Sequence, residues 1–126
     1  MTAITIFGAG GRMGRVIAEI VGSRDDVTIV PEGADVFVDF SAPAALESNL
    51  AAARAAGKPI LIGTTGLDAG HQRLIDDASM KVAVLHAANT SLGVNLLAHP
   101  VREAAARLGP GWDIEIVEMH HRHKAD

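Results

Sequence analysis

The chain opens with a short apolar run that breaks into glycines and then resumes with helical spacing. Residues 4–7 read Ile-Thr-Ile-Phe and residues 8–14 read Gly-Ala-Gly-Gly-Arg-Met-Gly. The apolar residues that follow on one helical face are Met13, Val16, Ile17 and Ile20. Strand, glycine turn and helix, in this order, form the context in which a glycine fingerprint carries meaning. The opening therefore predicts a βα unit built around the turn.

The glycines of this turn have distinct expected roles. Gly8 permits the tight turn, Gly10 or Gly11 lets a diphosphate approach the backbone, and Gly14 allows close packing of the helix on the strand. N–H groups at the start of the helix, with the positive end of its dipole, would supply an anion site. The turn predicts dinucleotide binding, although plain connections between strands and helices also contain glycine.

Composition is typical of one α/β domain. Of the 126 residues, 48% are hydrophobic and only 3% aromatic, so Ala, Val, Ile and Leu must build the core, which suits parallel strands covered on both faces. The lack of cysteine excludes a disulfide scaffold. A net charge of −4 without a Lys/Arg run disfavours nucleic acid. We see no membrane-spanning run and no signal peptide, and expect a cytoplasmic protein.

The rest of the chain alternates between expected strands and helices. The strands are expected at residues 3–7, 27–30, 35–40, 59–62, 81–85 and 112–118. The helices are expected at residues 11–22, 43–56, 68–78 and 91–108. This alternation predicts a Rossmann-like, doubly wound parallel sheet in a single three-layer domain that spans residues 1–126.

Glycine and polar residues follow nearly every expected strand. These segments are residues 8–14, 32–33, 39–41, 63–66, 87–91 and 120–124. The carboxyl ends of parallel strands share one edge of a sheet, and ligands bind there in open α/β folds. The sequence therefore predicts the functional site at this edge.

Several of these segments also have a purely structural interpretation. Residues 63–66 either cradle a nicotinamide ring or form a plain loop whose threonines cap the next helix. Ser91 is expected to cap the long helix, and Asp39 either serves the site or bonds only to nearby backbone. Glu32 lies where a ribose-binding acid is expected, but Glu-Gly is also an ordinary turn.

Residues 118–124, Glu-Met-His-His-Arg-His-Lys, form the sharpest polar cluster. Strand alternation would place the histidines on two faces, and Arg122 and Lys124 would repel a cation, so we expect no metal. One interpretation is a solvated basic tail. The other is a site for an anionic substrate, where a histidine could move a proton at neutral pH.

The motifs at residues 8–14, 38–41, 63–66, 88–95 and 118–124 resemble, in the same order, those of the 4-hydroxy-tetrahydrodipicolinate (dihydrodipicolinate) reductase family. The resemblance spans nearly the whole chain, and the histidine–lysine motif is highly specific to that family. It implies NADH- or NADPH-dependent reduction of a cyclic, imine-type dicarboxylate in lysine and diaminopimelate biosynthesis. It also implies a homo-oligomer for the full-length protein.

The resemblance implies roles for individual residues. His120 corresponds to the proton donor or acceptor, and Lys124 to a lysine that donates a proton and pairs with a substrate carboxylate. His121 corresponds to a substrate-binding histidine, and Thr65 is expected to contact substrate as well as cofactor. The expected cofactor-binding residues are Gly8, Ala9, Gly10, Gly11, Arg12, Met13, Glu32, Gly63, Thr64, Thr65, Ala87, Ala88, Asn89 and Thr90.

Two departures from the family pattern set further expectations. The family continues beyond this motif with a substrate-binding domain that begins Ser-Gly-Thr, so we expect the chain alone to turn over weakly or not at all. The family also has a longer segment where this chain has residues 30–34. The cofactor choice is thus open, although a Glu32 that reached the ribose would favour NADH, because its carboxylate repels the 2′-phosphate of NADPH.

Two other classes of protein fit parts of the pattern. A non-catalytic dinucleotide-binding or sensing module would have the glycine turn and an inert histidine tail. A fold like that of homoserine dehydrogenase fits the first five expected strands, but it leaves residues 120–124 unexplained.

Overall fold

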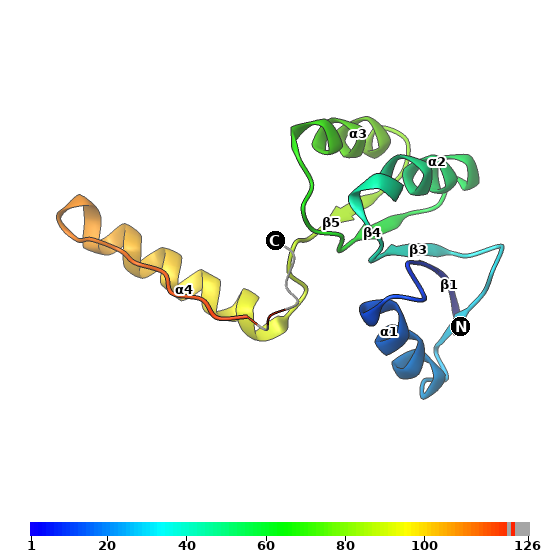
Figure 1. Ribbon diagram of the computed structural model, residues 1–126, viewed down its shortest axis with the longest axis horizontal. Helices are drawn as coiled ribbons and strands as arrows, with labels where there is room; N and C mark the ends of the chain where they lie inside the picture. The colour runs from blue at the N-terminus through cyan, green and yellow to red at the C-terminus, as the bar shows by residue number, and fades with distance from the viewer. Residues whose placement is uncertain (121, 123–126) are drawn as a thin grey trace. The chain divides into compact units, whose positions relative to one another are not determined.

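The computed structural model describes residues 1–120 and 122 and groups the chain into two compact units, Met1–Ala88 and Asn89–Asp126 (Figure 1). The first unit holds every strand of the described residues. These are β1 (Thr2–Phe7), β2 (Val27–Ile29), β3 (Val36–Asp39), β4 (Ile60–Ile62) and β5 (Val84–His86). The expectation of a single domain over residues 1–126 stays a prediction, because a division into compact units does not test it.

The five strands form one parallel sheet in the order β2-β1-β3-β4-β5. Ile4 of β1 pairs with Ile29 of β2 on one side and with Val36 of β3 on the other. The strand order therefore reverses between β1 and β3. In doubly wound sheets this reversal opens a crevice at the carboxyl ends of the two strands, and ligands bind in it.

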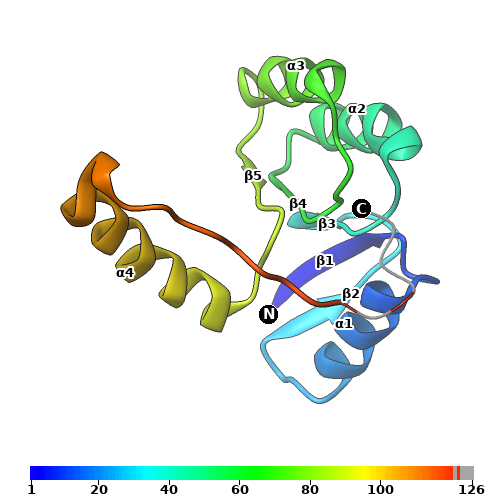
Figure 2. The ribbon, with the colours of Figure 1, turned by 60° about the vertical axis from the view of Figure 1, so that its left-hand side comes forward.

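Helices cover both faces of the sheet, which confirms the expected Rossmann-like fold class. Helix α1 (Arg12–Gly22) lies on one face, and α2 (Leu46–Ala56) and α3 (Ala69–Ser79) lie on the other (Figures 1 and 2). The α2–α3 face holds the main core, which consists of Leu46, Leu50, Ala53, Ile60, Ile62, Ile75 and Ala78. The rings of Phe7 and Phe37 stack on one another with centroids 5.3 Å apart, and both residues pack against this core.

A short crossover joins β2 to β3. The Thr5 hydroxyl donates to the Val30 carbonyl at 2.7 Å, and the Asp35 N–H donates to the Ala3 carbonyl at 2.7 Å. Residues 30–35 thus pass directly over β1, and Ala34 is buried at the crossing. This connection contains no helix and no strand of its own that could pair with the outer side of β2. β2 is therefore an edge strand of the sheet.

The prediction of a sixth strand at residues 112–118 is wrong. Helix α4 (Leu92–Leu108) and the 3₁₀ turn η2 (Gly109–Gly111) precede this segment, and residues 112–119 form no strand. Ile116 and Val117 are 85% and 87% exposed. A run of β-branched residues becomes a strand only when another strand pairs with it, and none of the described residues pairs with this one.

Other boundaries differ from expectation by a few residues. The fifth strand was expected at residues 81–85, but the N–H groups of Lys81 and Val82 donate to the Ala78 carbonyl at 2.9 and 3.1 Å. These two residues therefore continue the turn that ends α3, and β5 begins later. The 3₁₀ turn η1 (Pro43–Ala45) replaces the start of the helix expected from residue 43. No helix among the described residues is long and apolar enough to cross a bilayer.

Candidate functional site

The turn after β1 requires glycine at its first position. Gly8 has φ = +82°, and its carbonyl accepts a hydrogen bond of 2.9 Å from the Gly11 N–H. A Cβ at Gly8 would lie 2.5 Å from the Phe40 carbonyl oxygen, which approaches from the end of β3. The tight turn expected at Gly8 is confirmed, and its cause is both the backbone conformation and a neighbouring strand.

Two further glycines of the turn have contrasting surroundings. A Cβ at Gly14 would lie 2.2 Å from the Gly8 carbonyl oxygen, so α1 can start only because this position has no side chain. The close approach expected at Gly14 is confirmed, although the helix meets the turn rather than the strand. A Cβ at Gly10 would meet nothing within 4 Å, so this part of the turn faces open space that a ligand could fill.

Helix α1 begins without a capping side chain. Its N-cap residue is Gly11, and its first turn has no acidic residue. The N-terminus of α3 is capped by Asp68, and that of α4 by Ser91, whose hydroxyl accepts from the Val94 N–H as expected. The first N–H groups of α1, at the positive end of the helix dipole, are thus suited to an external anion.

A cleft of about 300 Å³ opens at the carboxyl ends of β1, β3 and β4. One side comes from the start of α1, and the other from the loops after β3 and β4. Its lining residues are Gly11, Arg12, Met13, Phe40, Ser41, Gly63, Thr64 and Thr65. The cleft lies where the strand order reverses, and it brings together six of the expected cofactor-binding residues.

A buried carboxylate joins the two loops on one side of the cleft. Asp39, at the end of β3, is fully buried, and its Oδ1 accepts hydrogen bonds from Ser41 N–H (2.9 Å), Ser41 Oγ (2.5 Å) and Thr64 Oγ1 (3.1 Å). Its Oδ2 accepts from Asn49 Nδ2 of α2 at 3.0 Å. Asp39 therefore does more than bond to nearby backbone, because its partners come from three segments of the chain.

The two threonines of the loop after β4 differ in what they offer a ligand. The Thr64 hydroxyl donates to Asp39 and accepts from the Ser41 N–H at 3.1 Å, and the residue is only 4% exposed. Thr64 therefore presents mainly backbone to the cleft, whereas Thr65 is exposed. Neither threonine caps α3.

Asp68 caps α3 instead, through hydrogen bonds from the N–H groups of Gly70 (2.8 Å) and His71 (3.0 Å). The His71 ring also lies 2.7 Å from the same carboxylate oxygen. The hydrogen bond from the His71 N–H is the main reason that the pKa of Asp68 lies below its ordinary value. The expectation that the threonines of residues 63–66 cap the next helix is therefore wrong, and the nicotinamide role of this loop stays a prediction.

Phe40 and Ser41 line the cleft but were not among the individual cofactor-binding residues expected from the sequence, although the segment 39–41 was expected at this edge. A Cβ at Gly63 would lie 2.1 Å from the Phe40 ring, so the ring can lie this close only because Gly63 has no side chain. The available sequence signal was position, since both residues directly follow the third strand and so reach the same sheet edge.

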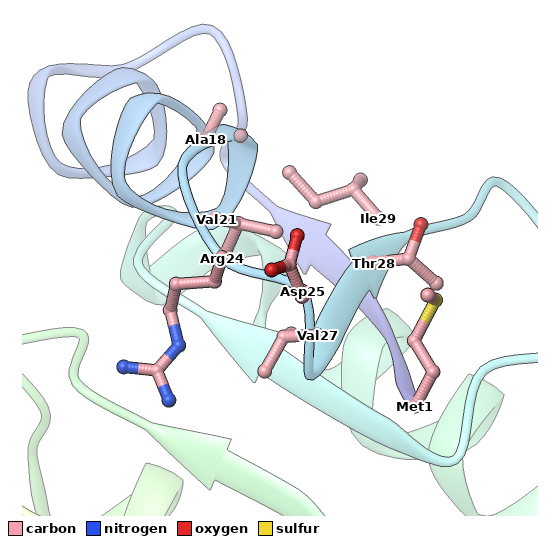
Figure 3. A pocket seen from close by; sticks show the side chains of 9 residues that line it. Met1, Ala18, Val21, Arg24, Asp25, Val27, Thr28 and Ile29 are labelled. Atoms are coloured by element: carbon pink, nitrogen blue, oxygen red, sulfur yellow. The ribbon is translucent and has the colours of Figure 1, made fainter.

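A second pocket, of about 390 Å³, lies between the carboxyl-terminal half of α1 and the edge strand β2 (Figure 3). It contains none of the expected site residues, and apolar side chains such as Val21, Val27 and Ile29 form much of it. Arg24 is paired with Asp26 at 2.5 Å. This pocket contains neither the glycine turn after β1 nor a helix N-terminus, whereas the cleft is lined by the start of α1.

The remaining expected cofactor-binding residues do not line the cleft. Glu32 is exposed in the connection that follows β2. The Ala87 N–H donates to the Ile62 carbonyl at 3.0 Å, which places residues 87–88 after β5 at the same sheet edge. Asn89 and Thr90 begin the second unit, where Asn89 Oδ1 accepts from the Ser91 N–H at 2.8 Å. The cofactor roles of these residues stay predictions.

Part of the expected catalytic cluster at residues 118–124 lies outside the described residues. His120 is exposed in the second unit, and its ring Nδ1 bonds to the Glu118 carboxylate. His121 and Lys124, together with residue 123, fall outside the described part of the chain. The roles expected for His120, His121 and Lys124 therefore stay predictions.

The fold and the position of the cleft define an α/β protein of the Rossmann type. Two family models match the chain, "Dihydrodipicolinate reductase, N-terminus" over residues 25–90 and "Dihydrodipicolinate reductase, C-terminus" over residues 93–126. The chain belongs to the dihydrodipicolinate reductase family.

Curated relatives agree with this assignment. The 4-hydroxy-tetrahydrodipicolinate reductase of Zymomonas mobilis is 48% identical over 141 aligned positions, which include 98% of this chain and 56% of the relative. That of Wolinella succinogenes is 43% identical over 100% of this chain and 59% of the relative. The chain thus spans less than two thirds of these relatives. The alignments are longer than its 126 residues, so the relatives contain residues that this chain lacks within the matched region.

Proposed function

We propose that the cleft binds NADH or NADPH, with the diphosphate at the start of α1 and the nicotinamide end toward the loops after β3 and β4. The observation that carries the proposal is that six expected cofactor-binding residues converge on one cleft at the strand-order reversal. A volume of about 300 Å³ is at the lower limit for a ligand pocket, so it would hold only part of a dinucleotide. The rest would lie along the sheet edge.

The residues present suit such a ligand. Glycine at positions 8 and 14 keeps the turn close to the helix, and the open side of Gly10 leaves room for a diphosphate against the backbone. Arg12 brings a cation to the cleft, and the Asp39 carboxylate behind the two loops is buried, with its oxygens hydrogen-bonded to protein groups. The diphosphate would therefore meet backbone N–H groups and a guanidinium group, both of which favour an anion.

Glu32 is proposed to contact the adenosine ribose. It follows the carboxyl end of β2, which is the strand next to β1 in the sheet. A carboxylate there accepts hydrogen bonds from the two ribose hydroxyls of NADH but repels the 2′-phosphate of NADPH. The chain is thus expected to bind NADH more tightly than NADPH.

We further propose that the whole protein reduces 4-hydroxy-tetrahydrodipicolinate, the reaction for which its relatives are named. We place this reaction in lysine and diaminopimelate biosynthesis in the cytoplasm. A bound reduced nicotinamide would supply a hydride. His120 and Lys124 would supply protons and positive charge, and His121 and Thr65 would hold the dicarboxylate substrate. Cationic side chains oppose the negative charge that develops on a substrate as hydride arrives.

Titration of the purified chain with each dinucleotide, followed by the fluorescence of the reduced nicotinamide, tests the binding proposal. Saturable binding of NADH, weaker binding of NADPH and a reversed preference in Glu32→Arg are the expected results. Equal affinities that do not respond to Glu32→Arg would remove the ribose role. The control is Glu47→Arg, which makes the same charge change on α2. A change at Gly33, next to Glu32, would strain the backbone because Gly33 has φ = +73°.

Turnover tests the catalytic roles separately. In a chain that includes the full length of the relatives, Lys124→Ala should lower kcat by about 10²-fold or more while the affinity for NADH changes little. Equal losses of turnover and cofactor affinity would indicate a structural role for Lys124.

A further inference from the structure

Asp39 has a carboxyl side chain in the protein interior, where an apolar side chain would cost less free energy to bury. It is fully buried at the end of β3, and its two carboxylate oxygens together accept four hydrogen bonds. Burial of a carboxylate carries a large desolvation cost, which only a complete set of partners offsets. Among the described residues, no buried side-chain nitrogen or oxygen lacks a partner. The network is therefore complete.

The partners of Asp39 lie in three segments that are distant in sequence. Ser41 follows β3, Thr64 follows β4, and Asn49 lies on α2. Asn49 also donates to the Ser41 hydroxyl at 3.1 Å, and the Gly63 N–H donates to the Asp39 carbonyl at 2.8 Å. The loop that contains Ser41 and the loop that contains Thr64 are thus fixed to one another through a single carboxylate.

These two loops form the side of the cleft that faces the start of α1. Ser41 and Thr64 line the cleft, whereas Asp39 and Asn49 do not. The Ser41 N–H, the Ser41 hydroxyl and the Thr64 hydroxyl all point to Asp39, so these donors are directed inward rather than toward a ligand. What the network determines is the position of the backbone and of the Phe40 ring that packs on Gly63.

We propose that Asp39, held by Asn49, is a positioning residue that sets the spacing of the two loops and thereby the affinity of the cleft for a dinucleotide. This inference rests on the proposed dinucleotide binding. A preformed wall loses less conformational freedom when a ligand binds, so loosening it lowers affinity without removing any contact to the ligand.

Asn49 provides the sharpest test because it is outside the cleft lining. Asn49→Ala removes one donor to Asp39 and one to Ser41, and we expect it to raise the Kd for NADH about tenfold. Asp39→Asn, which keeps the side-chain shape but places an amide nitrogen opposite the Asn49 amide, should have at least the same effect. Binding is measured at a temperature at which circular dichroism shows each variant to be folded.

Ile75→Val is the control, because Ile75 is a buried core residue of α3 that lies outside the cleft lining. It should lower the Tm without changing the Kd, and that result supports positioning over general stability. Wild-type affinity in both Asn49→Ala and Asp39→Asn, or an equal loss in Ile75→Val, would overturn the inference. A wild-type chain that binds neither NADH nor NADPH would overturn the proposed function itself, and this inference with it.

Discussion

Gly10 and Gly14 belong to the same turn, yet an added methyl group would meet different surroundings at each. At Gly14 it would lie 2.2 Å from the Gly8 carbonyl oxygen and 2.6 Å from the Ala9 Cα. At Gly10 it would meet no protein atom within 4 Å. One glycine is therefore required by folding, and the other leaves space that we assign to the ligand.

Alanine substitutions separate these two effects. Gly14→Ala should destabilise the chain by about 1–3 kcal/mol, because backbone atoms cannot move away from the new methyl group without disturbing the turn. Gly10→Ala should keep stability within about 0.5 kcal/mol and still raise the Kd for NADH about tenfold. Urea unfolding and dinucleotide titration measure the two quantities.

Gly22→Ala is the control for this pair, because a Cβ there also meets nothing within 4 Å and the residue lies at the far end of α1. It should affect neither affinity nor stability adversely. Gly10→Ala with unchanged affinity would argue against a diphosphate at the turn.

Residue roles could be predicted from the sequence where the cause is local. The close contact between Gly8 and Gly14 and the Ser91 cap depend on neighbours a few positions away, and both were anticipated. The contact of Gly8 with Phe40 comes from a neighbouring strand. The Asp39 network was not anticipated, because its partners Asn49 and Thr64 lie 10 and 25 positions further along the chain. Only the fold brings these side chains together.

At the scale of elements, the packing of α2 and α3 on the sheet gives the first unit its main core. Leu50 of α2 is 3% exposed and belongs to this core. Leu50→Ala should destabilise the chain by about 2–5 kcal/mol, since the surroundings can close the cavity only in part. Met80→Ala, at a position that is 80% exposed, should change stability by less than about 0.5 kcal/mol. Equal midpoints of urea unfolding for the two variants would contradict this description of the core.

Element types followed from apolar periodicity, and the misassigned element shows the limit of that approach. Residues 112–118 have the composition of a strand, but strand formation depends on a pairing partner that local sequence does not specify. The five strands that were confirmed each pair with another strand of the sheet. The late start of β5 has a different cause, because the carbonyl of Ala78 retains two N–H groups that the apolar pattern assigns to the strand.

For the whole molecule, three carboxylates predict a loss of stability in acid. A hydrogen bond from the Arg24 side chain, one from the Ala3 N–H and one from the His71 N–H are the leading causes that keep the pKa values of Asp26, Asp35 and Asp68, respectively, below the ordinary 3.8. A depressed pKa in the folded state means that the stabilisation is present above the unfolded pKa and is lost as pH falls through the folded value. The Tm should therefore decrease as the pH is lowered below about 4.

Asp68→Asn isolates one of these contributions, because asparagine also caps helices but does not titrate in this range. The variant should keep a Tm near that of the wild type at pH 3 and fall short of it at neutral pH. A wild-type Tm that is constant from pH 5 to pH 3, or an Asn variant with an unchanged pH profile, would contradict the assigned hydrogen bonds.

The most direct test of the central claim is a map of backbone amide shifts by two-dimensional NMR as NADH is added to the isotope-labelled chain. We predict saturable shifts at residues 10–13, 40–41 and 63–65, on both sides of the cleft, with little change at Ala18, Val21 and Thr28 around the second pocket. Shifts confined to that second pocket, or none with either NADH or NADPH, would contradict the account.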